Sequence, residues 1–152
     1  MTTPIPTTKM QVQAALSDGM RVDATLRDHA FVIDEPKQAG GTDQGPSPTE
    51  LVLAALAACV SMVLRVAAVK HEIAVASVDA DAVAKFDLRG VMFKEAVAVP
   101  FQEITLSLRV TGSVDDAQLA LLKQAVHDYC PIHQLFTQAG TRILEEWQVT
   151  AG

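Results

Sequence analysis

The sequence has few cysteines, few glycines and prolines, and few aromatic residues. Of its 152 residues, 2 are Cys, 8 are Gly and 7 are Pro, and aromatic residues make up 5%. Two cysteines are too few for a secreted disulfide scaffold, and the low glycine and proline content excludes collagen-like and low-complexity chains. Because 49% of the residues are hydrophobic and 20% are charged, we expect one folded domain with a core over residues 1–152.

Positive charge is also scarce, and no apolar run reaches the length of a membrane span. Lys and Arg number 12 against 18 Asp and Glu, so the net charge of −6 leaves no broad cationic surface for nucleic acid. The N-terminal residues lack the basic and apolar regions of a signal peptide, which predicts a reducing, cytoplasmic location. The longest apolar run, Leu51–Leu64, has 14 residues, fewer than the roughly 20 that span a bilayer, so we expect no membrane association.

This apolar run predicts a helix that is enclosed by other structure. Ala, Leu and Met dominate the run, and apolar side chains fall on all of its faces. Ser47 suits the N-cap, Pro48 the first helical position and Glu50 the third, which together form a capping box. We expect the helix to run from Pro48 to about Lys70.

Alternating apolar and polar residues predict strands on both sides of this helix. The expected strands are Met10–Leu16, Met20–Leu26, His29–Ile33, Ile73–Phe86, Phe101–Val110 and Arg142–Thr150. Two further helices are expected, one that Ser113–Asp116 opens and that ends near Cys130, and one over Pro131–Gln138. The glycine- and proline-rich segment Gln38–Pro48 predicts a mobile or functional loop, and Leu88–Pro100 fits no single pattern.

The order of these elements indicates the fold class. It contains too few strand–helix–strand crossovers for a doubly wound parallel sheet, so we predict an α+β fold. About six strands and one further helix cannot cover the long apolar helix on every side. The uncovered part predicts a partner subunit.

The two cysteines are the candidate reactive residues. A thiol reacts as its thiolate, and Cys130, as N-cap of Pro131–Gln138, would face free N–H groups and the positive end of the helix dipole, with His133 one turn further. The alternative for Cys130 is a helix boundary that happens to carry a cysteine. Cys59, inside the apolar helix, would ordinarily be a small inert hydrophobe. A redox pair is the remaining possibility, because one thiol can attack and the other can resolve the sulfenic acid.

Metal binding and acyl transfer are competing uses of the same residues. Cys130 and His133 are three residues apart, and Cys59, His127 and Glu50 are further candidate ligands. No second C-x-x-C or H-x-x-x-H completes such a set, so we expect no metal site and no cofactor. A Cys–His–carboxylate triad for acyl transfer has no local signature in the sequence.

Two motifs resemble those of the OsmC/Ohr family. They are Gly45-Pro-Ser-Pro-Thr-Glu-Leu-Val-Leu-Ala-Ala-Leu-Ala-Ala-Cys59 and, with its cysteine 71 residues later, Tyr129-Cys-Pro-Ile-His133. The resemblance covers nearly the whole chain and implies an intertwined α+β homodimer, in which antiparallel sheets surround long buried central helices and two active sites lie at the subunit interface. It also implies that Cys59 attacks an organic hydroperoxide and releases the alcohol. Cys130 then closes a disulfide that a dithiol reductant, often lipoyl-linked, reopens.

The sequence differs from the family pattern in two respects, namely which cysteine is expected to be the more reactive and which residue precedes the first cysteine by ten positions. Local chemistry favours Cys130 as the more activated thiol, and we follow the family in giving the attack to Cys59. Family peroxidases commonly carry a Glu ten residues before the first Cys, paired with an early Arg beside the sulfur. Thr49 stands at that position here, Glu50 is assigned to capping, and Arg21 is the nearest candidate Arg, with a solvated strand arginine as its alternative. The chain therefore looks more like an OsmC-like paralogue than an Ohr peroxidase.

Two functions follow from these observations. The first is thiol-dependent reduction of organic hydroperoxides in oxidative-stress defence, with Cys59 and Cys130 as catalytic residues. The second is a non-catalytic binding module that holds an apolar ligand in a pocket at the dimer interface.

Overall fold

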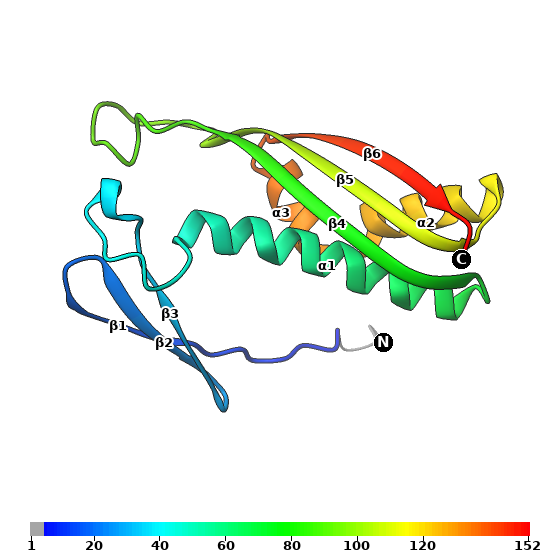
Figure 1. Cartoon of the computed structure of the whole chain (residues 1–152), viewed down its shortest axis with the longest axis horizontal. Coiled ribbons are helices and arrows are strands. Elements are labelled where there is room, and N and C mark those ends of the chain that lie inside the picture. The colour runs from blue at the N-terminus through cyan, green and yellow to red at the C-terminus, as the bar shows by residue number, and fades with distance from the viewer. Residues whose placement is uncertain (1–4) are drawn as a thin grey trace. The chain divides into compact units, whose positions relative to one another are not determined.

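The computed structural model describes residues 5–152, and the chain divides into two compact units, Met1–Leu51 and Val52–Gly152. The first unit contains an antiparallel sheet in the order β1 (Gln13–Asp18), β2 (Arg21–Leu26) and β3 (His29–Ile33) (Figure 1). β1 begins three residues later than predicted from Met10, because its first pair, Gln13 with Thr25, already lies near the end of β2. A single 3-10 turn, η1 (Lys37–Ala39), follows the sheet.

A buried carboxylate organises the loop between β3 and the first helix. Asp34 accepts hydrogen bonds from the hydroxyl of Thr42 at 2.5 Å and from the N–H groups of Glu35 and Gln44 at 2.8 and 3.2 Å. These bonds, the Thr42 hydroxyl first, lower the pKa of Asp34. Gly41 lies so close to this turn that a Cβ would stand 1.8 Å from the carbonyl oxygen of Glu35. The glycine-rich segment, predicted to be mobile or functional, is thus pinned by a hydrogen-bond network.

The long helix α1 (Pro48–Lys70) has the predicted bounds and the predicted capping box. The Glu50 N–H donates to Ser47 Oγ at 3.3 Å, and the Ser47 N–H donates to the Glu50 carboxylate at 2.8 Å. Beyond this first turn, one stripe of the helix is buried, namely Leu56, Val60, Leu64, Ala67 and Ala68. The side chains of Met62, Val66 and Val69 are exposed. The chain by itself therefore covers one stripe of α1 and leaves other apolar faces exposed, as the small number of strands and helices predicted.

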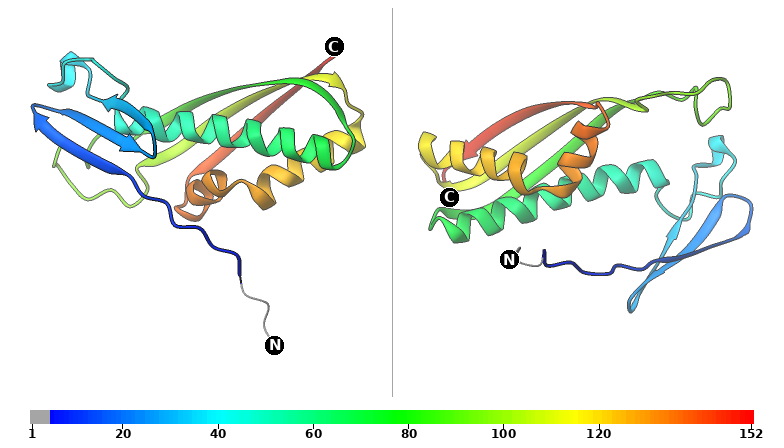
Figure 2. Two further views of the ribbon diagram at one scale, coloured as in Figure 1. Left: turned by 90° about the horizontal axis from the view of Figure 1, so that it is seen from below. Right: turned by 180° about the vertical axis from the view of Figure 1, so that it is seen from behind.

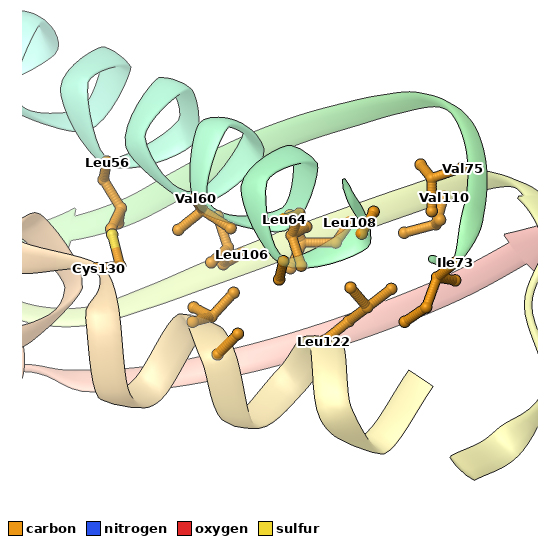
Figure 3. Packing of buried hydrophobic residues seen from close by; sticks show 14 of the residues in the cluster. Leu56, Val60, Leu64, Ile73, Val75, Leu106, Leu108, Val110, Leu122 and Cys130 are labelled. Carbon is orange, nitrogen blue, oxygen red and sulfur yellow. The ribbon is translucent and has the colours of Figure 1, made fainter. Parts of the chain in front are cut away.

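α1 is long and apolar enough to cross a membrane by length and composition, because it has 23 residues and contains an 18-residue window with a mean hydropathy of 2.3. The sequence-based estimate was shorter because it ended the apolar run at Arg65, whereas the helix continues over Val66–Lys70. A core helix meets the same criteria, and the buried stripe of α1 packs into the hydrophobic cluster of the second unit (Figure 3). Within the 18-residue window of α1 that meets these criteria, 28% of the residues are buried.

The second unit contains a mixed sheet in the order β4 (Ala74–Phe86), β5 (Phe101–Ser113) and β6 (Arg142–Thr150). β4 pairs antiparallel with β5, but β5 pairs parallel with β6. The expectation of purely antiparallel sheets is therefore wrong for β6. A parallel neighbour needs a long crossover, and α2 (Asp116–Tyr129) and α3 (Pro131–Gln138) supply it. The three helices lie on one face of this sheet (Figures 1 and 2).

The core lies between this sheet and the helices. β5 places alternate side chains in it, and these are Ile104, Leu106, Leu108 and Val110, as the alternation predicted. They belong to one hydrophobic cluster with the buried stripe of α1 and with Leu122 and Val126 of α2. Figure 3 shows part of this cluster, including Leu106, Leu108 and Leu122. Residues 88–100, which fitted no single pattern, contain neither helix nor strand, and Arg89 there pairs with the preceding Asp87. The order of helices and strands is the predicted one, and the fold is α+β.

Candidate functional site

Two elements of the second unit bring the two cysteines together. Cys59 lies in the middle of α1, and Cys130 is the N-cap of α3, as predicted. Although 71 residues separate them, the Cys59 thiol lies close enough to Cys130 to contribute to the raised pKa of Cys130. Both thiols are free. Figure 3 shows Cys130 next to Leu56, which precedes Cys59 by about one turn of α1.

The two thiols differ in their access to solvent. Cys130 is fully buried in the hydrophobic core, whereas Cys59 is partly exposed. Cys59 lines a groove of about 610 Å³ between α1 and α2. Most of the other lining side chains are apolar, among them Met62, Val63, Val66, Leu121, Ala125 and Tyr129, and Lys70 and His71 supply positive or polar groups. A molecule in the groove would therefore meet the sulfur of Cys59, with Cys130 shielded in the core.

The environment of Cys130 disfavours its thiolate. Burial raises the pKa of the Cys130 thiol to about 11, and the neighbouring Cys59 thiol acts in the same direction. The backbone N–H groups of His133 and Ile132 favour the anion, as the helix dipole predicts, although Cys130 makes no capping hydrogen bond of normal geometry. The local expectation of an activated Cys130 is therefore wrong, because desolvation outweighs the helix N-terminus.

A second polar cluster lies where α2, α3 and β6 meet. Nε2 of His127 and Nε2 of His133 lie 2.9 and 3.3 Å from the same carboxylate oxygen of Glu145. The indole N–H of Trp147 donates to the other oxygen at 2.9 Å. Burial works against ionisation of Glu145, but the hydrogen bonds from His133, Trp147 and His127 bring its pKa down to about 2. Glu145 is therefore a carboxylate at neutral pH.

The residues considered as supports for the first cysteine are engaged within the first unit. The Glu50 carboxylate accepts hydrogen bonds from the N–H and the hydroxyl of Ser47, which lower its pKa, so Glu50 acts in capping as predicted. The guanidinium of Arg21 pairs with Asp23 at 2.7 Å and with the side chain of Gln44. Glu50 is thus committed to the start of α1, and Arg21 to its strand and the following loop.

Sequence reasoning missed the part that Glu145 and Trp147 play. It named His127 and His133 as candidate ligands, but it grouped them with Cys59, Cys130 and Glu50. A signal was present in the alternation of β6, where Ile143, Glu145 and Trp147 share the half-buried face. A carboxylate on the inward side of a strand needs hydrogen-bond partners. The nearby histidines are the residues that provide them.

Solved structures share this fold. An OsmC-like protein from Mycoplasma pneumoniae is 17% identical with a TM-score of 0.73, covering 95% of this chain and 97% of that one. A Legionella pneumophila protein described as an organic hydroperoxide resistance protein OsmC is 18% identical with a TM-score of 0.67, covering 96% and 99%. A hypothetical protein from Aquifex aeolicus VF5 is 17% identical with a TM-score of 0.75, covering 96% and 99%. At these identities the likeness shows the fold.

The sequence itself carries the family assignment. No curated protein matches the chain. The family model described as OsmC-like protein matches residues 41–145, more than half of the chain, and this range includes both cysteines. The chain therefore belongs to the OsmC-like family.

Proposed function

We propose that this protein reduces organic hydroperoxides to alcohols with Cys59 and Cys130 as its redox pair, in defence against oxidative stress. The observation that carries the proposal is the proximity of the chain's two cysteines, one of which lines an apolar groove while the other is buried. An apolar groove suits a peroxide with an organic substituent. The name of the Legionella protein points to the same class of substrate.

The proposed reaction has two steps in the protein and one with a reductant. The Cys59 thiolate attacks the distal peroxide oxygen, the O–O bond breaks, and the leaving alkoxide takes a proton to become the alcohol. Cys59 is then a sulfenic acid, which the Cys130 sulfur attacks to form a disulfide with release of water. A dithiol reductant, for example a lipoyl group, exchanges with this disulfide and restores both thiols while it is itself oxidised.

The environments of the two sulfurs support this order. Cys59 lines the groove, so a substrate reaches it without opening the core. Cys130 is buried, and its pKa of about 11 keeps it protonated at neutral pH. A buried, protonated thiol is a poor first nucleophile, but it is held next to the sulfur that it must resolve. The exposed thiol therefore attacks and the buried thiol resolves.

We also propose that two copies of the chain associate through the uncovered face of α1, as an intertwined homodimer with a buried central helix. Met62, Val66 and Val69 are exposed on this face in the single chain. Contiguous apolar surface of this kind is typical of an interface. Two free thiols as the working state also fit a reducing compartment such as the cytoplasm.

The decisive experiment follows thiol loss when the reduced protein meets cumene hydroperoxide. Wild type should lose both thiols for each peroxide reduced, and Cys59→Ser should leave Cys130 intact. Cys130→Ser should stop at a sulfenic acid that dimedone traps. Ser61→Ala is the matched control, because Ser61 lies two residues from Cys59 and its hydroxyl donates to the Ala57 carbonyl. Unchanged thiols in the wild type, or equal loss in Cys59→Ser, would remove the proposal.

The groove also favours a second candidate function, that of a non-catalytic binding module. It is large enough for a small apolar molecule, and the polar residues of its lining, namely Lys70, His71, Gln124 and Asp128, can bind a polar end. Native mass spectrometry of protein isolated from cells separates the two functions. A bound small molecule without peroxide-dependent thiol loss would support the binding module. An empty groove with rapid turnover would exclude it.

A further inference from the structure

Three metal-binding side chains converge at the junction of α2, α3 and β6. Nε2 of His127, Nε2 of His133 and a carboxylate oxygen of Glu145 all lie within 4.8 Å of one another. His127 comes from the last turn of α2, His133 from the first turn of α3, and Glu145 from the middle of β6. The fold, and not a local sequence motif, therefore assembles this cluster.

From this geometry we propose that His127, His133 and Glu145 bind a divalent transition-metal ion, with Zn²⁺ as the first candidate. Two imidazole nitrogens and one carboxylate oxygen form a borderline-soft ligand set that suits Zn²⁺, and also Co²⁺ or Ni²⁺. Hard cations such as Ca²⁺ and Mg²⁺ prefer sites made only of oxygen. Three protein ligands leave one tetrahedral position for water. The site departs from our sequence-based expectation of no metal.

The surroundings of Glu145 favour a cation. Among the described residues, the charged or titratable partners of its carboxylate are the two histidines, and no Lys or Arg pairs with it. Its second oxygen accepts the indole N–H of Trp147, which fixes the orientation of the carboxylate. Hydrogen bonds of this kind to a ligating carboxylate are a usual support of metal sites. The carboxylate is thus held in place while its other oxygen faces two imidazole nitrogens.

The three ligands also differ in solvent exposure in a way that suits ion entry. The side chains of His133 and Glu145 are 8% and 15% exposed, whereas that of His127 is 51% exposed. The two imidazole rings are stacked at 5.2 Å with an interplanar angle of 15°. A metal must lie in the plane of each ring that binds it, so one ring has to turn. His127 is the better placed of the two rings to turn, because about half of its side chain is exposed.

A metal bound at this site would also affect the segment that carries Cys130. His127 and His133 lie on either side of Cys130, in the two helices that meet there. A metal bound to both histidines and to β6 would brace the segment that carries the buried thiol. The proposal does not depend on peroxide reduction, because it rests on ligands that are separate from the two sulfurs.

The test measures Zn²⁺ affinity in a full-length chain whose own thiols cannot bind the metal. Cys59→Ser/Cys130→Ser, stripped with a chelator and titrated against a chromophoric zinc indicator, should bind one Zn²⁺ per chain. Adding His127→Gln should weaken binding at least about tenfold. This side chain is exposed, so the fold should survive, which circular dichroism checks. His29→Gln, at an exposed histidine in β3, is the matched control and should bind as tightly as the parent.

A second measurement covers the case in which the double cysteine variant does not fold. Co²⁺ added to the reduced wild type should give the visible bands of nitrogen and oxygen coordination. A sulfur-to-cobalt charge-transfer band would instead show that the thiols hold the metal, and would overturn the proposal. Absence of Zn²⁺ binding at micromolar concentration, or equal affinity in His127→Gln and His29→Gln, would overturn it as well.

Discussion

Cys130 illustrates how two local effects on one thiol can oppose each other. Its place at the N-terminus of α3 puts two backbone N–H groups near the sulfur, which favours the thiolate. Burial in the core favours the thiol and prevails. The sequence showed the helix start, because Pro131 marks it, but burial depends on α1 and on β5. The chemistry of this residue therefore could not be predicted from its neighbours in the sequence.

Closure of the Cys59–Cys130 disulfide should speed up as the pH rises. Because the pKa of Cys130 is about 11, its thiolate fraction is small at neutral pH and grows about tenfold per pH unit below that value. The decay of the Cys59 sulfenic acid, followed by stopped flow after one equivalent of peroxide, should accelerate about tenfold per unit between about pH 7 and 9. A rate that stays constant across this range would contradict the assignment of Cys130 as the resolving thiol.

Asp87 offers a second residue-scale prediction, directly before the segment Leu88–Pro100 that fitted no single pattern. Arg89 donates to both of its carboxylate oxygens, at 2.9 and 2.6 Å, and these bonds lower the pKa of Asp87 to about 2. The lowered pKa means that the pair stabilises the folded loop above the ordinary value of 3.8 and that this contribution is lost as the pH falls toward 2. NMR titration of the Asp87 carboxyl carbon should give a midpoint near 2 in the wild type. In Arg89→Gln the midpoint should move back toward the ordinary value. An unchanged midpoint would show that Arg89 does not lower the pKa of Asp87.

At the scale of elements, the boundaries with chemical markers could be predicted. Ser47, Pro48 and Glu50 fixed the start of α1, and Pro131 fixed the start of α3, because caps and proline act within one turn. The parallel pairing of β5 with β6 could not be predicted, because the alternation of a strand indicates its faces and not its neighbour. The same holds for the site. Both cysteines could be identified from the sequence, but the contact of Glu145 with two histidines could not, because it depends on the pairing of β6 with β5.

The strand pair of β4 and β5 should tolerate no side chain at Gly112, which lies opposite Val75. A Cβ there would lie 2.1 Å from the carbonyl oxygen of Ala74, a backbone atom that cannot move without disturbing the strand pair. Gly112→Ala should therefore lower the free energy of unfolding by about 1–3 kcal/mol, measured by urea denaturation. Gly90→Ala is the control, because its Cβ would meet only the side chain of Val97 at an ordinary 3.6 Å. Equal stability of the two variants would contradict the close approach.

At the scale of the whole molecule, the main feature that one chain leaves unexplained is the exposed side of α1. The helix is apolar on all faces, but its own chain buries one stripe of it. Groups on the exposed side also line the groove in front of Cys59, among them Met62 and Val66. If a second copy packs on this side, it would also border the groove and limit what reaches the sulfur. Association and substrate access would then be linked through the same helix face.

Substitution of one valine on this face tests the association without altering the groove. Val69 is 72% exposed on α1 and is not part of the groove lining, so Val69→Glu should change the protein from dimer to monomer in light scattering at micromolar concentration. A charge is costly to bury at an apolar interface, whereas it is tolerated in solvent. Val83→Glu is the matched control, because Val83 is 70% exposed on the outward face of β4, beside Asp81 and Lys85. A dimer that survives Val69→Glu, or one that only Val83→Glu disrupts, would place the interface away from α1.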